Sequence, residues 1–184
     1  KSENKSDSVH ELPDDVIQST ICRIVEIEGP VHLDEIARRV ASAGGLKRMS
    51  SRVTQTVETQ VDQLVTRAAL VRDFEFLTIP NQRIRVRVRR TAIHLRTPAL
   101  IALSEIHVGV LAIVETHFGA SRDDAIVETG RLFGFSATSP QLRDRIDGEI
   151  TTMLANGALA ESDGWLHAGA EAVSDFGVSP ESVK

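Results

Sequence analysis

The fold of this chain is decided by a stretch that occurs twice, as IQSTICRIVE at residues 17–26 and as IHVGVLAIVE at residues 106–115. The shift of 89 positions that relates these two stretches continues without a gap from residues 17–77 to residues 106–166. Matching pairs along the way include Asp34 and Asp123, Gly45 and Gly134, and Leu77 and Leu166. A fixed shift over this length indicates a structural duplication. The sequence therefore predicts two small domains rather than one large core.

Each copy has the pattern of three helices followed by a β-hairpin. Apolar residues at helical spacing predict helices that begin at Asp14, near Leu33 and after Ser50-Ser51, and Gly29-Pro30 and Gly44-Gly45 separate them. Short apolar runs then predict the hairpin, from Leu70 to Ile79 in the first copy and from Leu159 to His167 in the second. We read this order as that of a winged helix, although the link between the second and third helices is longer than a strict helix-turn-helix turn.

The expected fold is mainly α with small β hairpins (α+β), arranged as tandem winged-helix-like domains. The domains are placed at residues 12–80 and 101–167, with a basic strand and linker at 81–100 and flexible tails at 1–11 and 168–184.

Local signals fix several helix starts. His32 stands where a helix-entry residue is needed, so we interpret it as a cap rather than a ligand. In the second copy Ser121 and Asp124 form a capping box, and Ser139-Pro140 supplies a cap followed by proline in the first turn.

Composition excludes several classes of protein. Hydrophobic residues make up 41% and charged residues 26% of the 184, which is ordinary for a soluble globular chain. The single Cys22 rules out an intramolecular disulfide and favours a reducing compartment. No apolar run approaches the length that a bilayer requires, so we expect a cytoplasmic location and no membrane partner.

The segment from Arg83 to Arg89 alternates arginine with Ile84, Val86 and Val88. In a strand this alternation places Arg83, Arg85, Arg87 and Arg89 on one face and the apolar residues on the other. The arginine face needs anions, and these are either phosphates or carboxylates of the protein itself. Both alternatives stay open, because residues 38–90 hold 12 basic and 4 acidic residues whereas residues 91–184 hold 6 and 13.

If the first copy binds nucleic acid, its third helix faces the groove. The start of that helix carries the candidate contacts Lys47, Arg48, Ser51, Arg52 and Gln55, to which the four alternating arginines are added. Basic side chains, hydroxyls and N-terminal amides all bind phosphate. The third helix of the second copy has Asp144, Asp147 and Glu149 at positions that we expect to be exposed. Such a helix repels phosphate, and we assign the second copy to protein contact, or to packing against the first copy, rather than to DNA reading.

No catalytic arrangement is visible in the sequence. The six histidines show no metal-ligand spacing, and there is neither a phosphate-cradling glycine loop nor a nucleophile elbow. We therefore expect no catalytic residue, no metal site and no cofactor.

Two runs carry a family resemblance: GPVHLDEIARRV at residues 29–40 and GLKRMSSR at residues 45–52. They resemble the uncharacterised C-terminal domain of large bacterial superfamily 1 DNA/RNA helicase-like proteins, which also carry a restriction-endonuclease-like region of the very-short-patch-repair type. The resemblance implies a parent ATPase that acts on nucleic acid. It transfers no active-site residue, because the helicase and nuclease motifs belong to other regions of those proteins.

These patterns together predict a non-catalytic accessory module of a helicase/nuclease-type protein. Its partners are nucleic acid, expected to be duplex DNA bound weakly and without sequence preference, and the helicase/nuclease domains of the parent. The alternative is a protein–protein docking module, intramolecular or oligomeric, that has no direct contact with nucleic acid. A free-standing transcription regulator fits less well, since no ligand pocket or dimerisation helix can be identified.

Overall fold

The computed structural model describes residues 13–45 and 50–172. The chain divides into two units, residues 1–82 and residues 83–184. The basic segment that begins at Arg83 therefore belongs to the second unit.

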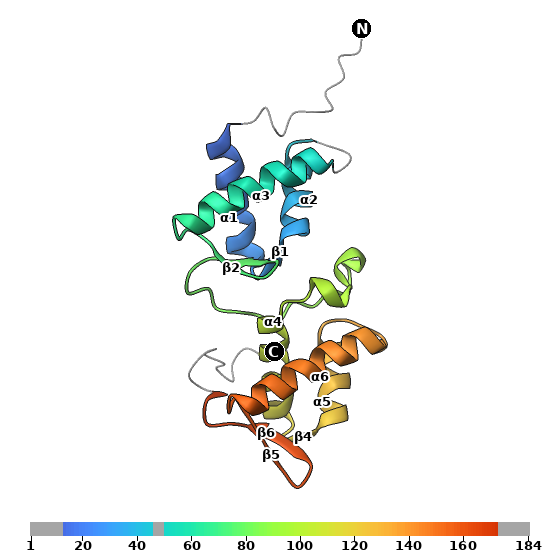
Figure 1. Cartoon of the computed structure of the whole chain (residues 1–184). Coiled ribbons are helices and arrows are strands. Elements are labelled where there is room, and N and C mark those ends of the chain that lie inside the picture. Colours follow the sequence, from blue (N-terminus) through green and yellow to red (C-terminus); the bar gives the residue numbers. More distant parts are fainter. Residues whose placement is uncertain (1–12, 46–49, 173–184) are drawn as a thin grey trace. The chain divides into compact units, whose positions relative to one another are not determined.

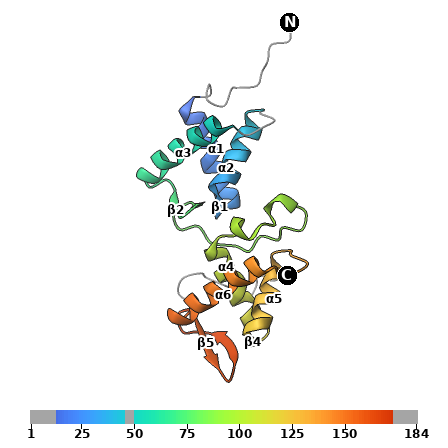
Figure 2. The same cartoon turned by 45° about the vertical axis from the view of Figure 1, so that its right-hand side comes forward.

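The described residues of the first unit form three helices and a small sheet (Figure 1). Its elements are α1 (Asp14–Glu28), β1 (Val31–His32), α2 (Leu33–Ala43), α3 (Ser51–Thr66), β2 (Val71–Asp73) and β3 (Phe76–Thr78). The strands form an antiparallel sheet in the order β1-β3-β2, with Val31 opposite Leu77. In both views α3 lies across α1 and α2 (Figures 1 and 2), and it packs against both.

The second unit repeats this arrangement. It contains η2 (Ile93–Leu95), η3 (Pro98–Leu100), α4 (Leu103–Thr116), β4 (Ala120–Ser121), α5 (Arg122–Leu132), α6 (Pro140–Ala155), β5 (Leu159–Ser162) and β6 (Trp165–Ala168). Its antiparallel sheet has the order β4-β6-β5, with Ala120 opposite Leu166.

The predicted duplication is confirmed in the arrangement of elements. Helices α1, α2 and α3 begin 89 positions before α4, α5 and α6. The described chain is mainly helical with small antiparallel sheets, as expected for an α+β protein. Each sheet has three strands rather than the two of the predicted hairpin, because the short extended piece before the second helix pairs with the last strand.

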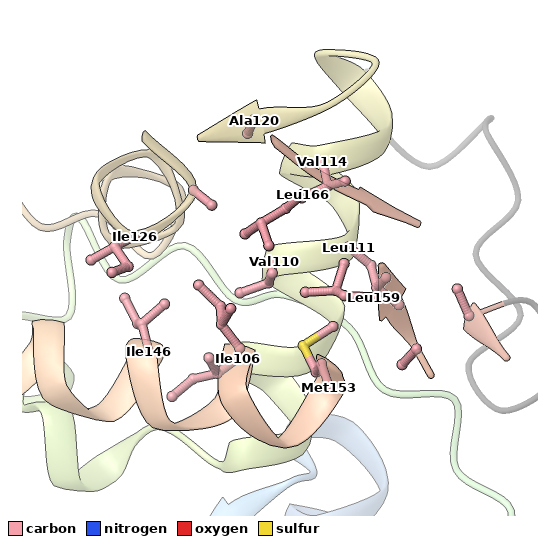
Figure 3. Packing of buried hydrophobic residues seen from close by; sticks show 14 of the residues in the cluster. Ile106, Val110, Leu111, Val114, Ala120, Ile126, Ile146, Met153, Leu159 and Leu166 are labelled. Atoms are coloured by element: carbon pink, nitrogen blue, oxygen red, sulfur yellow. The ribbon is translucent and has the colours of Figure 1, made fainter. Parts of the chain in front are cut away.

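Each unit encloses its own aliphatic core. In the first, Ile21 and Val25 of α1 pack with Ile36 of α2 and with Val57 and Val61 of α3. In the second, Figure 3 shows side chains of α4, α5, α6 and the two hairpin strands converging on one another. The labelled ones are Ile106, Val110, Leu111, Val114, Ala120, Ile126, Ile146, Met153, Leu159 and Leu166. Two closed cores explain how a chain with few aromatic residues folds.

The predicted helix starts are confirmed, with one change of detail. His32 caps α2, because its Nδ1 accepts a hydrogen bond from the Asp34 amide at 3.2 Å. Ser121 Oγ accepts from the Asp124 amide at 3.2 Å and donates to Asp124 Oδ2 at 2.6 Å. The carboxylate thus bonds to the capping hydroxyl, whereas a standard capping box bonds to the backbone amide. Ser139 caps α6 by accepting from the Leu142 amide.

A polar pair joins the first and third helices of each unit at equivalent positions, partly buried in the first unit and buried in the second. In the first unit Gln18 Nε2 donates to Gln60 Oε1 at 2.5 Å. In the second, His107 Nδ1 lies 3.0 Å from Glu149 Oε1, and both side chains are buried. The expectation that Glu149 is exposed is therefore wrong. It fails because the α6 surface that faces α4 is polar at this one position.

The ends of the predicted domains shift in the structure. The prediction that a flexible tail begins at residue 168 is wrong, since Ala168 still belongs to β6 and Ala172 is buried in the second core. The predicted tail at residues 1–11 lies outside the described residues, as do residues 173–184 of the predicted C-terminal tail. Among the described residues, no helix combines the length and the apolar character needed to cross a bilayer.

Candidate nucleic-acid interface

The start of α3 presents three of the predicted contact residues to solvent. Ser50 caps the helix by accepting from the Val53 amide, and Ser51, Arg52 and Gln55 follow as exposed residues. Val53, together with further valines and a leucine of α3, faces the core. The periodicity of the helix thus separates a polar outer face from a buried one. Lys47 and Arg48, which complete the predicted cluster, lie outside the described residues.

The later part of α3 is committed to contacts within the first unit. Arg72 of β2 bonds Asp62 at 3.0 Å and lies 3.8 Å from Glu58. Gln18 of α1 bonds Gln63, and it also accepts a hydrogen bond from Arg67 at the end of the helix. Two carboxylates on this stretch disfavour phosphate, so any contact with a nucleic-acid backbone is restricted to the first two turns of α3.

The arginine-rich segment does not form the predicted strand. Residues 82–89 have no regular secondary structure, and the alternation of inward and outward side chains changes partway along. Arg83 and Arg85 are exposed, as expected, but Val88 is also 56% exposed whereas Arg89 is only 3% exposed. The prediction of four guanidinium groups on one face is therefore wrong.

Glu105 at the start of α4 is the cause of this reversal. Its carboxylate accepts from Arg89 Nη1 at 2.9 Å and from Arg89 Nη2 at 2.6 Å. It also accepts from the Arg87 amide at 2.8 Å and from Arg87 Nη2 at 3.2 Å. Arg89 thus binds the fully buried carboxylate in a bidentate, charge-assisted manner. The segment is held by this carboxylate, whereas a strand would be held by hydrogen bonds to a partner strand. The sequence left two kinds of anion as partners of the arginines, phosphates or carboxylates of the protein. Arg87 and Arg89 bind a carboxylate of the protein.

Backbone contacts hold the same segment against α5. The Arg89 amide donates to the Phe133 carbonyl at 3.0 Å, and the Arg89 guanidinium lies 5.7 Å from the centre of the Phe133 ring. Gly134 adopts a φ of +93°, and a Cβ there would lie 3.0 Å from the Arg90 amide nitrogen. Glycine thus permits both the turn and the close approach of the segment.

Sequence reasoning missed Glu105, but the repeat contains a signal. Its counterpart in the first unit is Val16, which is 42% exposed. A change from valine to glutamate at the start of an otherwise apolar helix, in a chain with four nearby arginines, points to an ion pair within the second unit.

The basic residues on α5 and α6 also have partners inside the second unit. Arg143 binds Asp123 at 2.7 Å, and Arg122 binds Asp147 at 2.5 Å. The hydrogen bond between Arg122 and Asp147 lowers the pKa of the Asp147 carboxyl and raises that of the guanidinium. Arg145 donates to the Ile101 carbonyl at 2.8 Å, and burial lowers its pKa although Glu149 opposes this. Because these basic side chains already have partners, α6 presents less positive charge to a phosphate backbone.

Two further observations concern reactive groups. Burial raises the pKa of the Cys22 thiol, although the charge of Arg67 opposes this, which makes the reactive thiolate scarcer. Within residues 13–45 and 50–172, no three His, Cys, Asp or Glu side chains gather as metal ligands.

Comparison with protein families gives a match over part of the chain. Residues 7–55 match a family described as "Protein of unknown function (DUF3320)", a range that contains α1, β1, α2 and the predicted contact residues at the start of α3. No curated protein and no solved structure matches the chain. Residues 7–55 of this chain are thus similar to a protein family whose function is uncharacterised.

Proposed function

We propose that the chain is a non-catalytic accessory module made of two winged-helix-like domains. The order helix, strand, helix, helix, strand, strand in each unit supports this assignment. The third helix is then the element that a winged helix presents to a nucleic-acid groove. In this proposal the first unit binds nucleic acid weakly through the start of α3. Arg83 and Arg85, which begin the second unit, add contacts of their own, and the rest of the second unit makes protein contacts.

The observation that carries the nucleic-acid role is the exposed cluster at the start of α3. Ser51, Arg52 and Gln55 stand on the outer face of a 16-residue helix, near its N-terminal amides. Phosphate oxygens accept hydrogen bonds from hydroxyl, guanidinium and amide groups such as those of Ser51, Arg52 and Gln55. They are also attracted by the positive end of a helix. The acidic later part of the helix limits the contact to the backbone of one short stretch.

The burial of Arg87 and Arg89 reduces the expected electrostatic footprint. With these two arginines bound to Glu105, the basic groups proposed to contact phosphate are Lys47, Arg48 and Arg52, supplemented by Arg83 and Arg85. About three phosphate contacts at the helix give a slope of log affinity against log salt of roughly −3, and five give roughly −4.5.

The parent protein is part of the proposal. The family resemblance of residues 29–40 and 45–52 supports a helicase/nuclease-type ATPase that acts on nucleic acid in the cytoplasm. The module then helps to position the substrate, while the catalytic motifs reside in other regions of the parent.

Fluorescence anisotropy with short labelled duplex DNA, single-stranded DNA and duplex RNA tests the nucleic-acid role. We expect weak binding to duplex DNA without sequence preference and with the salt slope given above. Absence of binding at low salt, or binding that does not respond to salt, would remove the proposal.

A protein docking module remains the second candidate, on a specific observation. Arg87 and Arg89 are bound to a carboxylate of their own unit, and aromatic side chains are exposed in both units. Phe74 is 81% exposed, Phe118 93% and Trp165 51%. Loss of the interaction with the helicase/nuclease domains when Phe74 or Phe118 is changed to serine, without any nucleic-acid binding by the wild type, would favour this candidate.

A further inference from the structure

A cavity of about 240 Å³ opens on the second unit at the meeting point of α4, β4, α5 and β6. It is lined by His117, Gly119, Ala120, Asp124, Glu128 and Trp165. Ligand pockets for whole small molecules usually measure about 300–1,000 Å³. This cavity is smaller, and its size suits a single long side chain rather than a cofactor.

At the equivalent place in the first unit, an arginine bridges two glutamates. Shifting the lining residues by 89 positions leads to Glu28, Glu35, Arg39 and Phe76, among others. Arg39 Nη1 binds Glu28 at 2.8 Å, and Arg39 Nε binds Glu35 at 2.8 Å. In the first unit a guanidinium is thus held between two carboxylates at this place.

The second unit has lost that guanidinium and gained a carboxylate. Arg39 corresponds to Glu128, and Arg38, which also binds Glu35, corresponds to Val127. Counting Glu28, Glu35, Arg38 and Arg39 gives a charge of zero, whereas the equivalent His117 (taken as neutral), Asp124, Val127 and Glu128 give −2. Arg131, which binds Glu128 and corresponds to the neutral Ser42, brings the second value to −1. The first unit thus carries a cation, Arg39, at the position where the second unit carries the carboxylate of Glu128.

We propose that this cavity binds an arginine side chain of a partner protein. The inference rests on the proposed role of the second unit in protein contact, and it specifies the chemistry of that contact. Arginine is favoured because a guanidinium bonds carboxylates with several parallel donors and also stacks on aromatic rings. Asp124 and Glu128 provide the carboxylates, and Trp165 lines the cavity as the aromatic residue.

Neighbouring groups compete for the two carboxylates only in part. Asp124 Oδ2 accepts from the Ser121 hydroxyl, and Glu128 Oε1 accepts from Arg131. The Arg131 side chain is 63% exposed, and exposed ion pairs of this type contribute little stability. An incoming guanidinium can therefore share or displace this contact.

Phe118 supports a docking role for this edge of the unit. It stands between the lining residues His117 and Gly119, has a φ of +57° and is 93% exposed. A bulky side chain is rare in the left-handed region, and exposure leaves it without packing that would offset the strain. A partner segment that carries an arginine can cover this ring with its own apolar surface.

The single tryptophan of the chain makes the proposal directly measurable. Because there is no tyrosine and Trp165 is the only tryptophan, the intrinsic emission of the full chain reports on the cavity. We would titrate the full chain with the peptide acetyl-Ala-Arg-Ala-amide and with the same peptide containing citrulline, which has the shape of arginine without its charge. We expect a saturable change in emission with the arginine peptide and none with the citrulline peptide.

Two substitutions and a matched control complete the test. Glu128→Gln should weaken binding of the arginine peptide about fivefold. Glu128→Arg, which copies the first unit, should abolish the saturable response. Asp144→Asn removes a carboxylate that does not line the cavity and should leave binding unchanged.

Several results would overturn this inference. They are equal responses to both peptides, no saturable response to the arginine peptide, or equal effects of the Glu128→Gln and Asp144→Asn substitutions. Emission that changes with protein concentration in the absence of peptide would identify a second copy as the occupant and would equally overturn it. Nucleic-acid binding by Glu128→Gln, measured in parallel, separates a failure of this inference from a failure of the proposed nucleic-acid role.

Discussion

Arg89 and Glu105 form an ion pair with two hydrogen bonds, of 2.6 and 2.9 Å, in the interior of the second unit. Arg89 is 3% exposed and Glu105 is fully buried. Desolvation of two charges costs free energy that the mutual attraction recovers only if both partners remain. The pair therefore fixes the conformation of the connecting segment more than it adds stability.

The first prediction follows from this pairing. Glu105→Gln leaves the Arg89 charge buried without a counter-charge and should lower the free energy of unfolding of the second unit by about 3–5 kcal/mol. Urea unfolding followed through Trp165 emission measures this change in the free energy of unfolding. Glu115→Gln, on the exposed face of the same helix, should change stability by no more than about 0.5 kcal/mol. The double variant Arg89→Met with Glu105→Leu should recover much of the loss. Equal free energies of unfolding for Glu105→Gln and Glu115→Gln would refute the structural role of the Arg89–Glu105 pair.

The second prediction separates the arginines of the connecting segment. Replacing the exposed Arg83 and Arg85 by alanine should reduce the magnitude of the salt slope for DNA binding by about 2. Arg89→Ala should lower stability and leave the slope unchanged, because its guanidinium is occupied by Glu105. A change in slope with Arg89→Ala in folded protein would contradict this assignment.

The third prediction concerns Arg52 at the start of α3. Arg52→Glu should abolish detectable binding of duplex DNA, since it reverses a charge beside the helix amides. Arg23→Glu is a matched control, because Arg23 is an exposed arginine of the same unit that is paired with Glu26. The two variants are compared by anisotropy at low salt, and an equal loss in both would show that only net charge matters.

The fourth prediction is a dependence of stability on pH. Burial would raise the pKa of Glu35, but hydrogen bonds and charges of Arg38 and Arg39 hold it below its ordinary value of 4.5. A lowered folded-state pKa means that the stabilisation is fully present above the unfolded value and is lost as the pH falls through the folded one.

The thermal stability of wild type should therefore exceed that of Glu35→Gln at neutral pH, and the difference should shrink as the pH falls below about 4.5. Melting curves between neutral pH and pH 3 measure this difference. Glu26→Gln, which removes an exposed carboxylate of α1, should show little dependence on pH by comparison. A difference between wild type and Glu35→Gln that stays constant with pH would contradict the assignment.

Local signals and the repeat were sufficient to predict most of the fold. The caps His32, Ser121 and Ser139 act where the sequence placed them, because a helix start depends on groups within about one turn. The constant shift then gave the second unit the same order of elements as the first.

The long-range pairs could not be predicted by the same rules. Alternation between Arg83 and Arg89 is typical of a strand, but whether a strand forms depends on a partner strand, and here the carboxylate of Glu105 replaces one. The burial of Glu149 was missed for a similar reason, since its partner His107 lies 42 positions away. Comparing the two copies position by position would have shown polar residues at both ends of each pair.

That correspondence has a consequence for engineering. The first unit joins α1 to α3 with two amides, Gln18 and Gln60, whereas the second joins α4 to α6 with an imidazole and a carboxylate. A chimaera that exchanges one helix alone pairs a glutamine amide with an imidazole or with a carboxylate, so the swap changes both the charge and the geometry of this contact. The native pairing is kept when helices are exchanged in sets that bring both members together.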